Sequence, residues 1–323
     1  MCLPASLSLL VVWVALAQDL ARPEGPGPIL KVDVSLVTLT ATVLDGVGRA
    51  HPGLKKDDFV VYEDGIPQEI AVFSNAEDIP VSLGIVFDTS GSMSDKIDEV
   101  GDAVIHLISL VNPEDEIFVM RFSTDVSLVQ NFTSDRRRLQ RAVKDLQARG
   151  STALYDAVVE GLQVTRNGKH QRKALLVITD GNDTSSKMRL KETVDLAVRS
   201  EVPIYNLGIG HGERGSFGHL PDLFKDTVDV DALLALSDAT GGKTFVLQGP
   251  HQKNGVDQID RACLEVAAEL RQQYTLGYYP LRGRTDGNYR RIQVEVPKGT
   301  FKVRTRDGYF PSPQVAPSRP RPR

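Results

Sequence analysis

Between Val81 and residue 273, short apolar runs alternate with longer amphipathic stretches, and this alternation constrains the fold more than any other feature. The run Val81–Phe87 shows no strong polar–apolar alternation, which is typical of a strand covered on both faces. The segment after it has apolar residues at helical spacing, namely Ile97, Val104, Ile108 and Val111. Strands that alternate with helices predict an α/β fold with a doubly wound, mostly parallel sheet.

The same periodicities predict the remaining elements of this part of the chain. Strands are expected over 116–122, 126–130, 174–179, 202–209 and 243–247. Helices are expected over 135–147, 153–166, 188–200, 230–240 and 256–272. Cys263 falls on the apolar face of the last helix with Val256, Ile259, Val266 and Leu270. We therefore expect a buried, unreactive thiol.

Two β-rich segments flank the α/β domain, which we place at 79–273. In residues 30–78, apolar residues alternate from Val37 to Val43, and Asp45-Gly46 and Asp64-Gly65 signal turns. Residues 274–310 hold three short strand-like runs separated by glycines. Because so few strands do not form a stable domain alone, we expect both segments to pair in one β-sandwich-like module, with the α/β domain inserted between them.

The N-terminus indicates export. Leu7–Leu16 is apolar but too short to cross a bilayer, and it ends in Ala15-Leu16-Ala17, a small-x-small cleavage pattern. Residues 1–17 are therefore expected to be a signal peptide, which makes the mature protein periplasmic or secreted, with no transmembrane segment. No Lys or Arg precedes the apolar run, so an uncleaved anchor or a wrongly assigned start is the alternative.

Two further segments have compositions that do not favour a packed core. Residues 18–29 are rich in Pro and Gly and are expected to form a linker, and residues 311–323 are expected to form a disordered Pro/Arg tail. The tail also holds the small basic cluster of the chain. Since the formal net charge is −4, the sequence lacks the basic footprint of a nucleic-acid-binding protein, and we expect no such partner.

Oxygen-bearing side chains follow two of the buried strands. Asp88 ends the first strand and is followed by Ser90 and Ser92, while Asp180 ends the strand over 174–179. Thr152 lies at the start of a helix, in a loop that contains Gly150. In open α/β sheets, ligands bind outside the carboxyl ends of the strands, so these side chains should lie together. Hydroxyl and carboxylate oxygens favour Mg²⁺, with Mn²⁺ or Ca²⁺ as alternatives.

Three motifs, in order, resemble a known family. DTSGSM from Asp88, GSTALYDA around Thr152 and VITDGND around Asp180 resemble the metal-ion-dependent adhesion site of the von Willebrand factor type A domain, over roughly residues 78–273. The resemblance implies that Ser90 and Ser92 coordinate the metal directly, and that Thr152 and the two aspartates do so directly or through water. The flanks resemble bacterial exported "VWFA-related" proteins, most of them uncharacterised.

This resemblance implies a binding module and not an enzyme. The metal would keep one electrophilic position, which the Asp or Glu carboxylate of a partner protein could fill. A hydrolase would need a general base beside the metal-bound water, and the five oxygen residues include no His or Lys. Asp156 and Asp183 are close in sequence, but a helix-face or loop-capping role explains them more simply.

Other interpretations have less support from the sequence. No nucleophile elbow surrounds Ser90 or Ser92, and the glycines from Gly208 to Gly212 lack the third spaced glycine of a phosphate loop. His211 and His219 form a pair without a third ligand at a fixed spacing. An assistant of an ATP-driven enzyme is disfavoured by the signal peptide. The alternative that stays open is a scaffold component of an envelope assembly, in which the metal only stiffens the fold.

Overall fold

The structure is a computed structural model that describes residues 36–75, 79–210, 228–251, 254–281 and 287–311. The expected signal peptide and linker lie outside these residues, as do His211, His219 and residues 312–323 of the expected tail.

The centre of the α/β domain is a six-stranded sheet with the order β10-β9-β8-β5-β6-β7. Its strands are β5 (Val81–Asp88), β6 (Glu116–Phe122), β7 (Val126–Thr133), β8 (Arg172–Thr179), β9 (Ile204–Gly210) and β10 (Lys243–Gln248). All neighbours are parallel except β7, which pairs with β6 in the antiparallel direction. The predicted fold class, a doubly wound and mostly parallel sheet, is confirmed.

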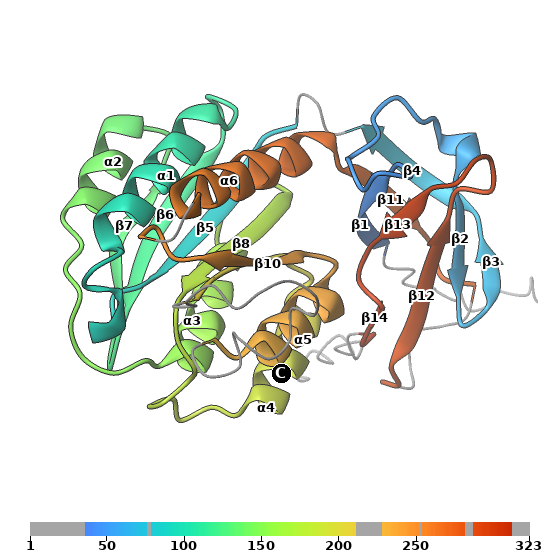
Figure 1. Cartoon of the computed structure of the whole chain (residues 1–323). Coiled ribbons are helices and arrows are strands. Elements are labelled where there is room, and N and C mark those ends of the chain that lie inside the picture. Colours follow the sequence, from blue (N-terminus) through green and yellow to red (C-terminus); the bar gives the residue numbers. More distant parts are fainter. Residues whose placement is uncertain (1–35, 76–78, 211–227, 252–253, 282–286, 312–323) are drawn as a thin grey trace, which may run out of the picture. The chain divides into compact units, whose positions relative to one another are not determined.

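Helices cover both faces of this sheet (Figure 1). On one face are α1 (Ile97–Leu110), α2 (Arg136–Lys144) and α6 (Gly255–Gln272), and on the other are α3 (Leu154–Arg166), α4 (Leu190–Ser200) and α5 (Val230–Thr240). Every residue of β5 is buried, which explains its continuous apolar run. The sheet thus has an apolar core on each face, which covers its central strands.

The flanking segments form two four-stranded sheets, ordered β13-β1-β11-β4 and β14-β12-β2-β3. Their strands are β1 (Val37–Leu44), β2 (Val60–Glu63), β3 (Ile66–Gln68), β4 (Ile70–Asn75), β11 (Tyr274–Tyr278), β12 (Arg290–Glu295), β13 (Lys302–Arg304) and β14 (Gly308–Tyr309). The N-terminal β1 pairs with β11 and β13, and β2 pairs with β12, always antiparallel. Side chains of both sheets share one apolar core, as the β-sandwich-like part of the predicted fold class requires.

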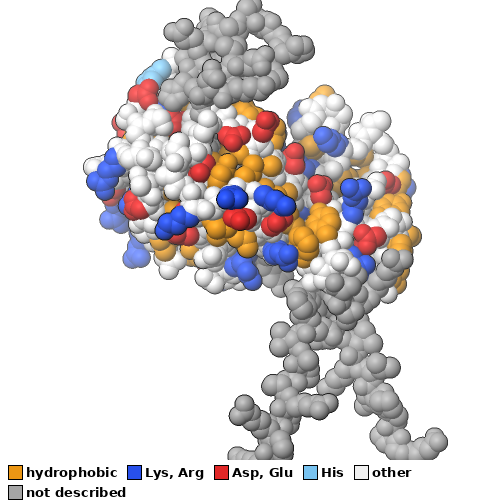
Figure 2. Space-filling model, turned by 90° about the horizontal axis from the view of Figure 1, so that it is seen from below, with side chains coloured by type: hydrophobic (Ala, Val, Ile, Leu, Met, Phe, Trp, Pro, Cys, Tyr) orange, Lys and Arg blue, Asp and Glu red, His pale blue; other side chains and the backbone are white. Residues whose placement is uncertain are grey.

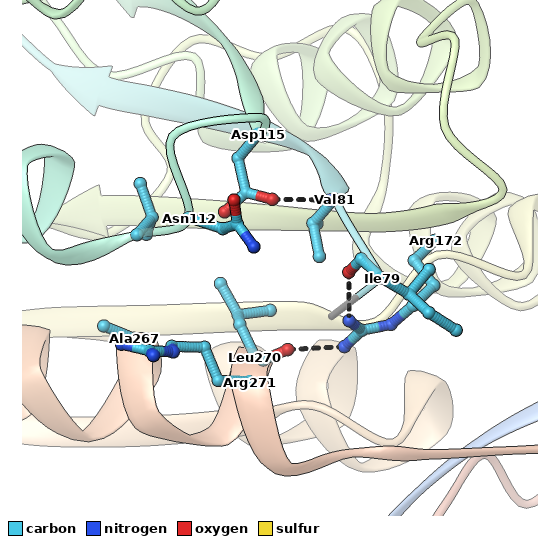
Figure 3. A pocket seen from close by; sticks show the side chains of 9 residues that line it. Ile79, Val81, Asn112, Asp115, Arg172, Ala267, Leu270 and Arg271 are labelled. Atoms are coloured by element: carbon cyan, nitrogen blue, oxygen red, sulfur yellow. Dashed lines mark hydrogen bonds between the residues drawn. The ribbon is translucent and has the colours of Figure 1, made fainter. Parts of the chain in front are cut away.

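The chain enters and leaves the α/β domain at one place, beside a small pocket at the amino ends of β5 and β8 (Figure 3). The guanidinium of Arg172 donates to the carbonyl of Ile79 on the way in, at 2.8 Å, and to the carbonyl of Leu270 on the way out. It also donates to Oε1 of Gln273 at 3.0 Å. Asp115, across the pocket, accepts the backbone N–H of Val81 at 2.7 Å. These hydrogen bonds join the entry and the exit of the α/β domain at this end of the sheet.

A few sequence expectations differ from the structure in detail. Val256 is 47% exposed, so it does not share the buried face of α6 with Cys263; it is the second residue of the helix, ahead of the turns that pack on the sheet. The helix expected over 135–147 ends at Lys144, and β7 runs three residues further than expected, to Thr133. Within the described ranges, no helix is long and apolar enough to cross a membrane.

Candidate metal centre

The carboxylate of Asp88 is held firmly at the base of the candidate site. Asp88 is the last residue of β5, its side chain is fully buried, and both carboxylate oxygens accept hydrogen bonds. Oδ1 accepts the backbone N–H of Ser90 at 2.7 Å, which folds the chain back over the strand end. Oδ2 accepts the hydroxyl of Thr179, on the neighbouring strand β8, also at 2.7 Å. The carboxylate is thus held in one orientation by the loop and by the adjacent strand.

Ser90, Ser92 and Asp180 form a continuous chain of oxygen atoms. The hydroxyl oxygens of Ser90 and Ser92 lie 3.0 Å apart, and the Ser92 hydroxyl donates to Oδ1 of Asp180 at 2.7 Å. The turn Gly91–Met93 carries Ser92 back towards Asp180, which follows the last residue of β8. Two loops that are distant in sequence therefore present their oxygens to the same point.

Thr152 reaches the same point from a third loop. A Cβ placed on Gly181 would stand 3.6 Å from the Thr152 hydroxyl oxygen and 4.0 Å from that of Ser92, so both hydroxyls lie above Gly181. The backbone N–H of Thr152 donates to the Thr184 hydroxyl at 3.0 Å, and its carbonyl accepts the N–H of Thr184 at 2.8 Å. All five residues singled out from the sequence are brought to one sheet edge.

Backbone hydrogen bonds join the three loops directly. The N–H of Gly91 donates to the carbonyl of Gly150 at 3.0 Å, and the N–H of Arg149 donates to the carbonyl of Thr89. Gly150 has a φ of +87°, and a Cβ there would stand 2.7 Å from the Thr124 hydroxyl, so the tight approach requires glycine. Direct backbone contacts therefore help to hold the three loops together.

The site is closed on most sides and open at one. Asp88, Ser90, Thr152 and Asp180 are at most 5% exposed, whereas Ser92 is exposed. Burial raises the pKa of Asp88 to about 6, against the hydrogen bonds from Thr179 and Ser90, which lower it. The carboxylate is therefore costly to keep ionised where it stands, and a nearby cation would offset that cost.

Two residues of the site were not recognised from the sequence. Thr179 orients Asp88, as described above, and Lys96 places its ammonium on Oδ2 of Asp180 and 2.8 Å from the carbonyl of Ser92. Lys96 is only 2% exposed. The sequence does contain a sign of this role. Lys96 follows Ser92 by four residues and stands immediately ahead of α1, where a positive charge is unfavourable.

The donor set fits a hard divalent cation. It consists of carboxylate and hydroxyl oxygens only, which Mg²⁺, Mn²⁺ and Ca²⁺ prefer. Among the residues that the structure describes, no three His, Cys, Asp or Glu side chains converge, so a metal here would depend on the hydroxyls of Ser90, Ser92 and Thr152.

The two neighbouring aspartates have other tasks. The carboxylate of Asp156 accepts the backbone N–H groups of Lys187 and Met188, at 3.0 and 2.9 Å. Asp183 accepts the Ser186 hydroxyl and the N–H of Tyr155. These contacts confirm the loop-capping role expected for both.

The surface bears on the kind of partner. In the view of Figure 2, Lys and Arg side chains are interspersed with Asp and Glu over the described surface. This face therefore mixes both signs of charge, in keeping with the small formal net charge of −4 of the chain.

Comparisons with known proteins agree with this geometry. A model of the von Willebrand factor type A domain matches residues 83–182, which include all five site residues. Inter-alpha-trypsin inhibitor heavy chain H3 of Rattus norvegicus is 26% identical over 202 residues, which are 57% of this chain and 22% of that protein. The Homo sapiens protein is 26% identical over 216 residues, which are 59% and 23%. The match thus spans less than a quarter of the length of these relatives.

Among solved structures, von Willebrand factor type A from Catenulispora acidiphila aligns with a TM-score of 0.49 and 13% identity, over 84% of this chain and 73% of that one. The von Willebrand domain of the type V pili tip protein Mfa5 from Porphyromonas gingivalis aligns with a TM-score of 0.46 and 10% identity, over 60% and 97%. The sheet order, the loops at its carboxyl edge and the match over residues 83–182 together show that this chain carries a von Willebrand factor type A domain.

Proposed function

We propose that this protein is an exported, divalent-metal-dependent binding module that captures an acidic side chain of a partner protein, and that it is not an enzyme. Domains of this family are in general protein-interaction or adhesion modules. The observation that carries the proposal is the convergence of five oxygen-bearing side chains from three loops, with Ser92 alone exposed.

Each residue has a separate task in this proposal. Asp88, Ser90, Ser92, Thr152 and Asp180 would hold the cation, preferably Mg²⁺. When bound, the cation supplies an electrophilic position for a carboxylate of the partner. Thr179 fixes the rotation of the Asp88 carboxylate, and the exposed side at Ser92 is where the partner would approach. Among the described residues, the neighbouring carboxylates Asp156 and Asp183 are engaged in loop contacts, which favours binding over a hydrolytic step.

The alternative is a scaffold protein in which the metal only stiffens the fold. Backbone bonds from Gly91 to Gly150 and from Arg149 to Thr89 join the loops directly, which favours a ligand-binding metal over a purely stiffening one. A stiffening metal would add little to such an arrangement, whereas a ligand-binding metal requires the loops to be held in advance.

Affinity capture tests the proposal. The immobilised chain is exposed to envelope and secreted proteins in Mg²⁺, and bound protein is eluted with EDTA. We expect a partner that elutes from the wild type and is absent from Asp88→Ala. Thr152→Ala should weaken capture while the melting temperature stays nearly unchanged, since the bonds from Thr152 to Thr184 are made by its backbone and survive the substitution. Equal elution from the wild type and Asp88→Ala would reject the binding role.

A further inference from the structure

Lys96 is a buried cation inside the candidate metal centre. Its side chain is 3% exposed, and its ammonium contacts Oδ2 of Asp180, whose side chain is fully buried. It also donates to the carbonyl of Ser92 at 2.8 Å. The ammonium therefore contacts the same carboxylate that a divalent cation would use, at Oδ2, whereas the Ser92 hydroxyl contacts Oδ1.

Local preferences do not explain this position. Lys96 is the N-cap of α1, where a side-chain acceptor such as Ser or Asp is favoured and where the helix dipole repels a positive charge. Burial of an ammonium adds a desolvation cost. A residue that breaks several local rules is expected at a functional site, where a second interaction offsets the cost. Here that interaction is the contact with Asp180.

Lys96 changes the net charge of the buried cluster. Two buried carboxylates, Asp88 and Asp180, and one buried ammonium, Lys96, give the cluster a formal net charge of −1. The nearby Asp95 lies 3.8 Å from the ammonium, but its side chain is 56% exposed and its charge is largely screened by solvent. With a divalent cation in place, the cluster would carry one net positive charge, and a single carboxylate would neutralise it. Without the lysine, the loaded cluster would already be neutral.

We infer that Lys96 is a built-in counter-charge of this centre, which lowers its affinity for the divalent cation and raises the affinity of the loaded centre for a carboxylate. The inference rests on the proposed function. Lys96 is then a positioning residue that acts through Asp180. Its replacement should strengthen the binding of the metal and weaken the binding of the carboxylate. If the lysine were merely structural, its replacement would weaken both.

The test uses Mn²⁺ as the metal and acetate as the carboxylate. Binding of Mn²⁺ to the full chain is measured calorimetrically, and displacement of metal-bound water by acetate is followed by water-proton relaxation. Lys96→Met keeps the buried stem and removes the charge, and Lys191→Gln removes a charge from the exposed face of α4 as a control. We expect Lys96→Met to bind Mn²⁺ at least about tenfold more tightly than the wild type. It should also require an acetate concentration about tenfold higher to displace the metal-bound water. Lys191→Gln should behave like the wild type in both measurements.

Each outcome decides the inference. Unchanged or weaker Mn²⁺ binding by Lys96→Met, or unchanged acetate displacement, would overturn it while the proposed function stands. Absence of Mn²⁺ binding in the wild type would instead reject the proposed function. If Lys96→Met is unfolded without metal, Mn²⁺ should restore its circular dichroism, because tighter binding to the folded state shifts the equilibrium. A variant that no Mn²⁺ concentration restores would contradict the inference.

Discussion

The hydroxyl of Thr179 donates to the carboxylate of Asp88 across two neighbouring parallel strands, at 2.7 Å. Thr179 is fully buried at the end of β8, and Asp88 is fully buried at the end of β5. This contact links the centre of the sheet to the candidate metal centre, because it holds the carboxylate of the first aspartate in one orientation.

Replacement of Thr179 should therefore affect both folding and metal binding. Thr179→Val keeps the shape but leaves one oxygen of a buried carboxylate without its donor, which should lower the free energy of unfolding by about 2 kcal/mol and weaken Mn²⁺ binding about tenfold. Urea unfolding and calorimetry measure the two effects. Thr193→Val is the control: Thr193 is equally buried, but its hydroxyl donates to the carbonyl of Arg189, the residue that precedes α4. Equal Mn²⁺ affinity in Thr179→Val and Thr193→Val would contradict the role of Thr179.

Much of this arrangement follows from the sequence. The apolar runs from Val81 and from residue 174 predicted buried strands, and each run ends in an aspartate, so Asp88 and Asp180 could be placed at one sheet edge. The order of the strands and the pairing of β1 with β11 depend on contacts between distant residues, which periodicity does not encode. The joining of the flanking segments was inferred from the instability of isolated strands, a physical argument and not a pattern.

Thr179 and Lys96 were missed for physical reasons. Threonine is an ordinary residue in a β-strand, and its task depends on the strand beside it. A lysine beside a helix start is usually solvated, and only the fold shows that Lys96 is buried against Asp180. Val256 was placed on the wrong face because helical spacing does not say where a helix begins to touch the sheet.

Cys263 should be inert in the folded chain. It is 1% exposed, and burial raises the pKa of its thiol to about 12, so the reactive thiolate is scarce at pH 8 and stays scarce at pH 9. Peptide mapping after iodoacetamide treatment distinguishes it from Cys2. We expect the Cys263 peptide to be modified only in denaturant; rapid modification in buffer at pH 8 would mean that α6 does not cover the thiol.

The guanidinium of Arg172 should be important for stability, because it joins the entry and the exit of the α/β domain. Arg172→Met leaves the carbonyls of Ile79 and Leu270 without this donor, and we expect a loss of about 3 kcal/mol in the free energy of unfolding. Arg166→Met, at an exposed position near the end of α3, should cost less than about 0.5 kcal/mol. If the two variants lost the same free energy of unfolding, the hydrogen bonds from Arg172 to Ile79 and Leu270 would be unimportant for stability.

Gly242 permits a close approach between the chain ahead of β10 and strand β9. A Cβ at this position would stand 1.8 Å from the carbonyl oxygen of Ile204, a backbone atom that has no room to move. Gly242→Ala should therefore cost about 3 kcal/mol in thermal or urea unfolding. Gly46→Ala, with no atom within 4 Å of the new Cβ, should be close to neutral, and an equally neutral Gly242→Ala would contradict the register of β9 and β10.

The most direct test of the central claim is calorimetric titration of the purified chain with Mn²⁺, alongside Asp88→Ala and Asp195→Ala. Asp195 is a matched control, because it carries the same charge on the exposed face of α4. The account predicts one binding site per chain in the wild type and in Asp195→Ala, and no measurable binding in Asp88→Ala. Binding by Asp88→Ala with the wild-type affinity, or no binding by the wild type, would contradict it.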